Sequence, residues 1–208
     1  MSLSDSKISE GHKVKFIERA KTALLDLIEE KPNDARIHLF LASVYKSTRE
    51  FDKATEQIDI VRQLSPSKPA VVIEQGVIAF QSGDRDLAAS YFKEAYDLEP
   101  RNREAQILHA ANLIMSGSVE AAREVVEDQY WTLFSQNAFA YEASVASGNR
   151  ELIVDVLEAR IAAKPKIPQN YVSLSAFYND NGLTSEAVAV IQRGIDVIPE
   201  FTAAGQCY

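Results

Sequence analysis

The residues that could carry out chemistry are few, and they stand far apart in the chain. The histidines are His12, His38 and His109, and the single cysteine is Cys207. Protein zinc sites combine about four cysteine or histidine ligands, and a nucleophilic cysteine needs a basic neighbour that lowers its pKa. The sequence offers neither arrangement, and it contains no serine-hydrolase elbow, phosphate-binding loop or zinc-protease motif. We therefore predict that the protein is not an enzyme and binds no metal or cofactor.

The charged residues give no binding surface for nucleic acid. Acidic residues outnumber basic ones by 30 to 22, for a net charge of −8. The basic pair Arg101 and Arg103 is local, whereas nucleic-acid binding needs a basic face. The acidic pair Asp84 and Asp86 falls at an expected turn, where carboxylates commonly cap a helix. We expect no nucleic-acid partner, and we interpret the acidic pair as structural.

The composition is that of an ordinary folded protein. Of the 208 residues, 46% are hydrophobic and 25% are charged, which is the usual globular mixture. No stretch approaches the roughly 18 consecutive apolar residues of a membrane span, and the first residues lack a signal-peptide core. We therefore expect no membrane insertion by this chain. Because both ends resemble the limits of a fragment, the compartment stays open: cytoplasmic by default, or extracytoplasmic if a longer parent protein is anchored in a membrane.

A repeat of 34 residues runs through the chain. Pro32, Pro66 and Pro100 are spaced by this interval, and so are Pro165 and Pro199. The gap from Pro100 to Pro165 is three residues short of two intervals. Small residues keep the same step in three sets, which are Ala54, Ala88 and Ala122; Gly83 and Gly117; and Gly148 and Gly182. Agreement across three residue types indicates a repeat architecture.

Apolar residues within each repeat have helical spacing. Ile37, Leu41, Val44 and Tyr45 form one stripe of a helix. A glycine near the middle of the repeat, such as Gly83, is placed to adopt a positive φ just after a helix ends, and the proline ends the second helix. Each repeat is therefore predicted to be a pair of antiparallel helices. The expected fold class is all-α.

This pattern resembles the tetratricopeptide repeat family, whose unit has 34 residues. The third period carries the typical residues Gly76, Ala88, Phe92, Ala95 and Pro100. The second supplies Leu41, Ala42, Tyr45, Ala54 and Pro66, and the last supplies Tyr171, Leu174, Tyr178, Ala187 and Pro199. The fourth period lacks the terminal proline, and the fifth has Ile153 where alanine is usual. The resemblance covers roughly residues 13–200. It implies a right-handed superhelical solenoid of antiparallel helix pairs, and it implies that the small residues are structural.

The resemblance also implies a division of the chain. We expect a disordered or tag-like N-terminus over residues 1–12, then a solenoid over 13–200 that starts with a helix at 13–31. The repeats are placed at about 35–68, 69–102, 103–133, 134–167 and 168–201, and residues 201–208 are expected to begin a capping helix. The three missing residues fall around 127–134.

A weaker resemblance concerns the last repeat. The run from Pro168 to Leu174 and the segment from Pro199 to Phe201 are similar to the C-terminal repeats of bacterial O-antigen ligase/polymerase-type membrane proteins. This resemblance implies an alternative function, as a structural or assembly domain of a larger membrane-anchored envelope protein of polysaccharide biosynthesis.

The first resemblance further implies a partner-binding groove lined by the first helix of each repeat. The residues at or beside its groove-facing places are Leu39, Ser43, Ile73, Val77, Phe80, Ile107, Ala111, Ile114, Met115, Phe139, Glu142, Val172 and Asn179. The lysine, asparagine and arginine clamp with which related domains grip a carboxylate is missing from these places. A largely apolar groove suits an amphipathic helix or an apolar segment. We therefore predict a non-enzymatic scaffold with a protein or peptide partner in this groove.

Two alternatives remain open at this stage. The apolar groove residues form either an exposed patch for a partner or a surface that the chain itself covers. The aromatic cluster Tyr130, Trp131, Phe134, Phe139 and Tyr141 either packs the shortened repeat or forms a binding hot spot. We favour a partner for the groove and packing for the aromatic cluster, because large rings fill the gap that an irregular repeat leaves.

Overall fold

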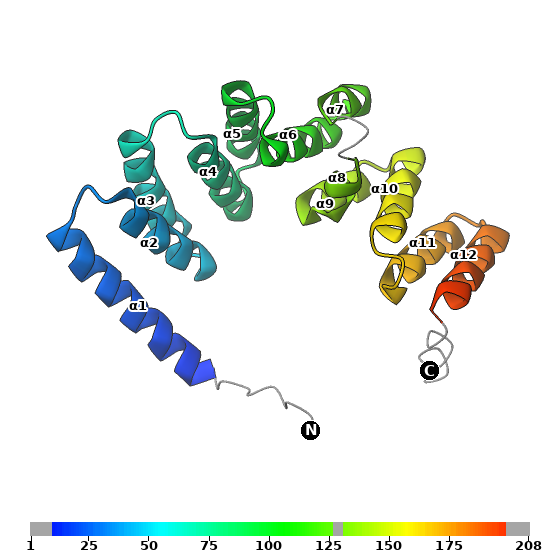
Figure 1. Ribbon diagram of the computed structural model, residues 1–208, viewed down its shortest axis with the longest axis horizontal. Coiled ribbons are helices and arrows are strands. Elements are labelled where there is room, and N and C mark those ends of the chain that lie inside the picture. Colours follow the sequence, from blue (N-terminus) through cyan, green and yellow to red (C-terminus); the bar gives the residue numbers. More distant parts are fainter. Residues whose placement is uncertain (1–9, 127–130, 199–208) are drawn as a thin grey trace. The chain divides into compact units, whose positions relative to one another are not determined.

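Figure 1 shows the computed structural model, which describes residues 10–126 and 131–198. Over these residues the chain folds into helices joined by short turns, without any strand. The helices are α1 (Glu10–Glu30), α2 (Ala35–Ser47), α3 (Phe51–Leu64), α4 (Pro69–Ser82), α5 (Arg85–Leu98), α6 (Arg103–Met115), α7 (Val119–Val125), α8 (Trp131–Gln136), α9 (Ala138–Ala146), α10 (Arg150–Ala163), α11 (Pro168–Asp180) and α12 (Thr184–Val197).

Local sequence explains where these helices begin and end. The Asp84 carboxylate accepts a hydrogen bond from the backbone N–H of Leu87 and so caps α5. Pro69 and Pro168 stand in the first turns of α4 and α11, where the missing N–H removes no helical hydrogen bond. Gly83 ends α4 with a φ of 99°, which is the left-handed conformation expected from the sequence.

The helices divide into two compact units, with the boundary between Ala105 and Gln106. In the first unit α2 pairs with α3 and α4 with α5, while α4 packs on α3 and α1 packs on α2. In the second unit α11 pairs with α12, and α10 packs against α8, α9 and α11. Because both units consist of antiparallel helix pairs, the predicted all-α class is confirmed (Figure 1).

Small residues allow the paired helices to approach closely. A Cβ atom added to Gly76 of α4 would lie 2.5 Å from a ring carbon of Phe92 in α5. Ala42 of α2 and Ala54 of α3 are fully buried in one cluster with Leu41. The structural role predicted for the small residues is therefore confirmed at these contacts, where a larger side chain would force the helices apart.

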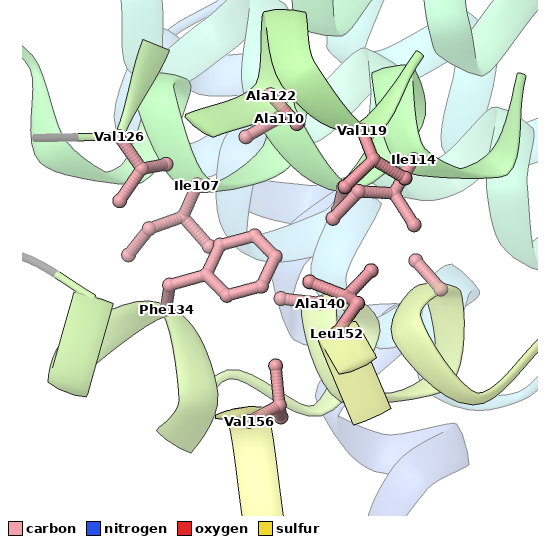
Figure 2. Packing of buried hydrophobic residues seen from close by; sticks show 12 residues of the cluster. Ile107, Ala110, Ile114, Val119, Ala122, Val126, Phe134, Ala140, Leu152 and Val156 are labelled. Carbon is pink, nitrogen blue, oxygen red and sulfur yellow. The ribbon is translucent and has the colours of Figure 1, made fainter. Parts of the chain in front are cut away.

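The irregular part of the repeat lies in the second unit. Helix α7 has 7 residues, whereas α3, α5 and α10 have 14 each. The additional short helix α8 places Phe134, which is 0% exposed, in a cluster with Ile107 and Leu152 (Figure 2). Phe134 therefore packs the shortened repeat, as the packing interpretation predicts. Tyr130 and the side chain of Trp131 lie outside the described residues.

Two expected boundaries differ from the observed ones. Helix α1 begins at Glu10, so residues 10–12 are helical although we expected them to belong to a disordered N-terminus. The boundary expected between residues 133 and 134 falls inside α8. Residues 201–208, the expected start of a capping helix, lie outside the described residues.

Candidate partner-binding groove

The structure divides the predicted groove residues by their exposure. The buried members are Ile73, Ile107, Ala111 and Ile114. The half-buried members are Val77, Phe80 and Phe139. The exposed members are Leu39, Ser43, Met115, Glu142, Val172 and Asn179. Only the last two sets present side-chain surface to a partner.

The structure corrects the prediction of an open groove at the buried residues of α6. Ile107, Ala111 and Ile114 belong to the main cluster of the second unit, and Ile114 is only 1% exposed. Figure 2 shows that Ile114 and Ile107 face side chains of α8 and α10, among them Phe134 and Leu152. The chain itself therefore covers these residues, which is the alternative left open by the sequence. Counting from the proline identifies a helix face but does not reveal which later helix packs on it.

In the first unit, Phe80 is held by a cation–π contact. The guanidinium of Arg85 lies 4.0 Å from the centroid of the Phe80 ring. Arg85 is the first residue of α5, so this contact spans the turn after α4. Arg85 thus contacts the half-buried Phe80 ring. A contact of Phe80 with a partner stays a prediction.

The last helix pair of the second unit forms an open groove of about 470 Å³. Two predicted residues of α11, Val172 and Asn179, line it, and α12 contributes Val188 and Ile191. Val188 is 64% exposed and Val172 is also exposed. The remaining lining residues are Ser175, Ala176, Thr184, Ala187 and Gln192. This arrangement, called the α11–α12 groove below, is an accessible apolar surface with uncharged polar groups.

The walls of the α11–α12 groove are fixed by hydrogen bonds at its floor and at the start of α11. The hydroxyl of Ser175 donates to the carbonyl of Ala187 at 3.0 Å and so joins the two helices. The side-chain amide of Asn170 donates to the carbonyls of Arg160 and Lys164, at the end of α10. The buried Tyr171 hydroxyl donates to the carbonyl of Pro165 at 3.0 Å. The groove is therefore preformed, which reduces the entropy lost when a partner binds.

Apolar and uncharged polar side chains line the α11–α12 groove. Its lining carries no charged side chain. Over residues 10–126 and 131–198, no three histidine, cysteine or acidic side chains come together as a metal site would need. None of the helices in these ranges is long and apolar enough to cross a membrane.

The contribution of α12 was missed by sequence reasoning, which considered only the first helix of each repeat. Val188 directly follows Ala187, the alanine place of the repeat, and is exposed on its helix. Val188 and Ile191, spaced by three residues on one side of the helix, were the available signal.

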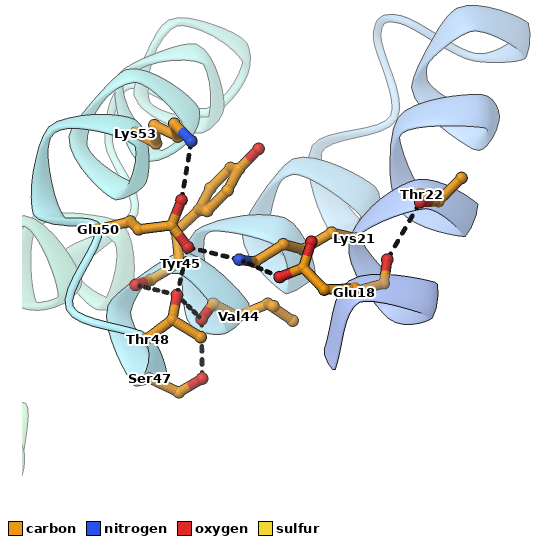
Figure 3. A network of polar contacts seen from close by, with 9 residues as sticks. All are labelled: Glu18, Lys21, Thr22, Val44, Tyr45, Ser47, Thr48, Glu50 and Lys53. Carbon is orange, nitrogen blue, oxygen red and sulfur yellow. Dashed lines mark hydrogen bonds and ion pairs between the residues drawn. The ribbon is translucent and has the colours of Figure 1, made fainter. Parts of the chain in front are cut away.

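A polar network in the first unit is structural. The Glu50 carboxylate accepts hydrogen bonds from Lys21 of α1, Lys53 of α3 and the hydroxyl of Thr48 (Figure 3). The Lys21 ammonium is the largest cause that lowers the pKa of Glu50 to about 2, and the same pair raises the pKa of Lys21. This network ties α1 to the turn between α2 and α3.

The two histidines His38 and His109 are both buried. His38 is buried, and its ring nitrogens lie 2.8 Å from the side-chain oxygen of Gln57 and 2.9 Å from the carbonyl of Pro32. His109 is buried on α6. His38 thus ties the start of α2 to α3, as Tyr171 ties α11 to the preceding turn.

Ion pairs between second helices of adjacent repeats were also not predicted. Arg62 of α3 pairs with Glu94 of α5, and Arg123 of α7 pairs with Asp155 of α10. In the same way Arg193 of α12 pairs with Glu158 of α10 at 2.9 Å. Each pair is partly exposed, so its contribution to stability is small. Their sequence signal, an opposite charge about one repeat away, becomes meaningful only once the pairing of helices is known.

Comparison with known proteins identifies the repeat in part of the chain. Residues 79–129 match the family model described as tetratricopeptide repeat. Among curated proteins, no sequence matches the chain.

Several solved structures share the fold. MamA protein is 17% identical with a TM-score of 0.60, and the match covers 84% of this chain and 96% of that one. YrrB, described as a TPR protein with an unusual peptide-binding site, is 16% identical with a TM-score of 0.55, covering 88% and 98%. A tetratricopeptide repeat protein from Parabacteroides merdae ATCC 43184 is 13% identical with a TM-score of 0.65, covering 88% and 73%. These matches give no support to the resemblance to O-antigen ligase/polymerase-type proteins.

Proposed function

Since this chain has the tetratricopeptide repeat fold and matches the family's repeat at residues 79–129, we propose that it is a non-enzymatic scaffold for protein–protein interaction. Proteins of this fold are generally interaction scaffolds, because stacked helix pairs create extended binding surfaces. The finer proposal is that the chain binds an apolar or amphipathic segment of a protein partner, with the α11–α12 groove as its principal site.

The observation that carries this proposal is the exposed apolar lining of the α11–α12 groove. Val188 and Val172 are exposed, and Ile191 lies half-buried beside them. Exposed apolar surface that is rimmed by polar residues is a frequent mark of interaction sites. The volume of about 470 Å³ lies within the range of protein binding pockets.

The lining also defines the chemistry of the partner. The apolar side chains of Val172, Val188 and Ile191 favour a helix face that carries leucine, isoleucine or a similar residue. Asn179 and Gln192 offer amide groups at the rim, which can bond to polar or backbone groups of the partner. Because no lining residue is charged, the groove gives no reason to expect an acidic tail as ligand.

Two features beyond the groove support the proposal. YrrB, which has the same fold, is described as having a peptide-binding site. Leu39, Ser43 and Met115, which were predicted to face a partner, are exposed as well. These residues are proposed as secondary contacts.

The proposal is tested by selecting binders from a displayed library of amphipathic helices and measuring their affinity for variants. We expect Val188→Asp to weaken binding of the selected peptides at least tenfold, because a carboxylate would be desolvated against an apolar segment. Folding should be preserved, since water already reaches Val188.

Ala189→Asp is the matched control, because Ala189 is the next residue of α12, is exposed and does not line the groove. Both variants add one negative charge. Equal affinities of the two variants would count against the groove, and a library without any binder would count against the scaffold proposal itself.

A further inference from the structure

The first helix carries an apolar stripe that the described chain leaves uncovered. Phe16, Ala20, Ala23 and Leu27 follow one another at helical spacing on α1. Phe16 is 74% exposed, Leu27 is 41% exposed, and Ala23 is exposed as well. A different face of α1 packs on the first unit through Leu24 and Ile28 (the stripe that faces α2). The exposed stripe is therefore a second apolar surface, separate from the core.

The repeat itself shows that this face is normally buried. Counted back from the closing proline, Leu27 of α1 holds the place of Val61 in α3 and of Ala95 in α5. Val61 is 3% exposed and Ala95 is fully buried. Helices α3 and α5 each pair with the first helix of their own repeat, α2 and α4, whereas α1 packs on the helix that follows it. A helix that lies along α1 would restore the missing pairing.

Charged residues beside the stripe indicate which helix fits. Lys15 and Arg19 flank its first half, and Asp26 and Glu29 flank its second half, with Thr22 between them. All five side chains are exposed, and in the described part of the chain none of the four charged ones joins the ion pairs that hold α1 to the first unit. In two antiparallel copies of α1, the basic residues of one copy therefore lie opposite the acidic residues of the other.

We propose that α1 is a self-association surface, on which α1 of a second copy of this chain binds in antiparallel orientation. The two-fold axis passes near Thr22, so that Phe16 packs on Leu27 of the second copy. Lys15 and Arg19 then face Glu29 and Asp26 of the second copy, and symmetry forms each contact twice. Ala20 and Ala23 lie at the centre, where small side chains let two helices approach closely.

The anchoring of α1 keeps this surface in place. Lys21 binds Glu50, and Figure 3 shows this side chain reaching from α1 toward the turn before α3. The Lys21 ammonium also lies 5.7 Å from the centroid of the Tyr45 ring. These contacts fix α1 on the first unit, so the exposed residues of the stripe are presented without any rearrangement.

The test measures the mass of the full chain by sedimentation equilibrium over a hundredfold range of concentration. The wild-type chain should approach twice its monomer mass. Lys15→Glu/Arg19→Glu should be monomeric, and Asp26→Lys/Glu29→Lys should be monomeric too, because each places like charges face to face in the homodimer. An equal mixture of the two variants should dimerise again, since opposite charges then meet at both ends.

Neither variant is expected to unfold α1, because glutamate and lysine are both good helix formers and all four positions are exposed. Circular dichroism of each variant checks this expectation. Phe16→Asp provides an independent variant, which should be monomeric and folded. A wild-type chain that stays monomeric would overturn the proposal, and so would charge variants that dimerise alone or a mixture that remains monomeric.

Discussion

At the scale of single residues, Arg49 departs from the pattern of the repeat. It has a φ of 62°, and the glycines at the same place of later repeats, Gly83, Gly117 and Gly182, have values of 99°, 84° and 75°. A side chain in this left-handed region costs roughly 1–2 kcal/mol relative to glycine. The repeat at about 35–68 therefore holds a strained turn, although the guanidinium of Arg49 lies 5.9 Å from the centroid of the Phe51 ring.

Arg49→Gly should stabilise the protein by about 1 kcal/mol, because it removes this strain. Urea unfolding monitored by circular dichroism measures the change. Gly83→Ala is the reciprocal control: a Cβ there meets no atom within 4 Å, so only the backbone conformation is affected, and stability should fall. A destabilised Arg49→Gly variant would show that the arginine side chain outweighs the strain.

Glu50 predicts a pH dependence of stability. Its pKa is lowered from 4.5 to about 2 in the folded protein, first by the hydrogen bond from Lys21. A depressed folded-state pKa means that the stabilisation is fully present above about pH 4.5 and is lost as the pH falls toward about 2. The difference in unfolding free energy between wild type and Glu50→Gln should therefore shrink across this window. A difference that stays constant from pH 5 to about pH 2 would contradict the assignment.

At the scale of elements, the close contact of α4 with α5 determines what the repeat tolerates. Gly76→Leu should destabilise the protein by about 1–3 kcal/mol or more, because the side chain must displace the buried Phe92 ring. Ala70→Leu in the same helix is the control, since Ala70 is exposed. Thermal melts measure the stability of both variants. Equal melting temperatures would mean that α4 and α5 do not pack as described.

The helix pairs were predictable from the sequence because their signals are local. Proline spacing, the glycine turns and stripes such as Ile37, Leu41 and Tyr45 mark each helix without reference to the rest of the chain. Helices α2, α4 and α11 each begin shortly after a closing proline, so the proline spacing locates these elements.

The exposure of the groove was predictable only in part, because it depends on contacts between distant segments. Val172 and Asn179 line an open groove, whereas Ile107 and Ile114 are buried by helices that follow the irregular repeat. Nothing in the spacing around residues 127–134 specifies the additional helix α8 or the place of Phe134. The contribution of α12 to the groove depends on which of its side chains are exposed, and the helical spacing of apolar residues does not predict this exposure.

At the scale of the whole molecule, a local loss of stability in a repeat protein mainly affects the neighbouring repeats. Phe134→Ala should cost about 3–5 kcal/mol, the usual range for a buried phenylalanine. Amide hydrogen exchange should accelerate in α6, α8, α9 and α10, whose side chains meet around Phe134, and should change least in α2 and α3. Leu133→Ala, an exposed neighbour in α8, is the control. Uniform acceleration along the chain would contradict this local coupling.

The central claim is that the chain binds a protein segment in the α11–α12 groove, and hydrogen exchange with a selected amphipathic peptide tests it most directly. The measurement covers every helix and does not presuppose the site. The account predicts that the peptide slows exchange in residues 168–197, with the greatest effect beside Val172 and Val188, and that Val188→Asp removes this protection. Protection confined to other helices, or the same protection in the Val188→Asp variant, would contradict it.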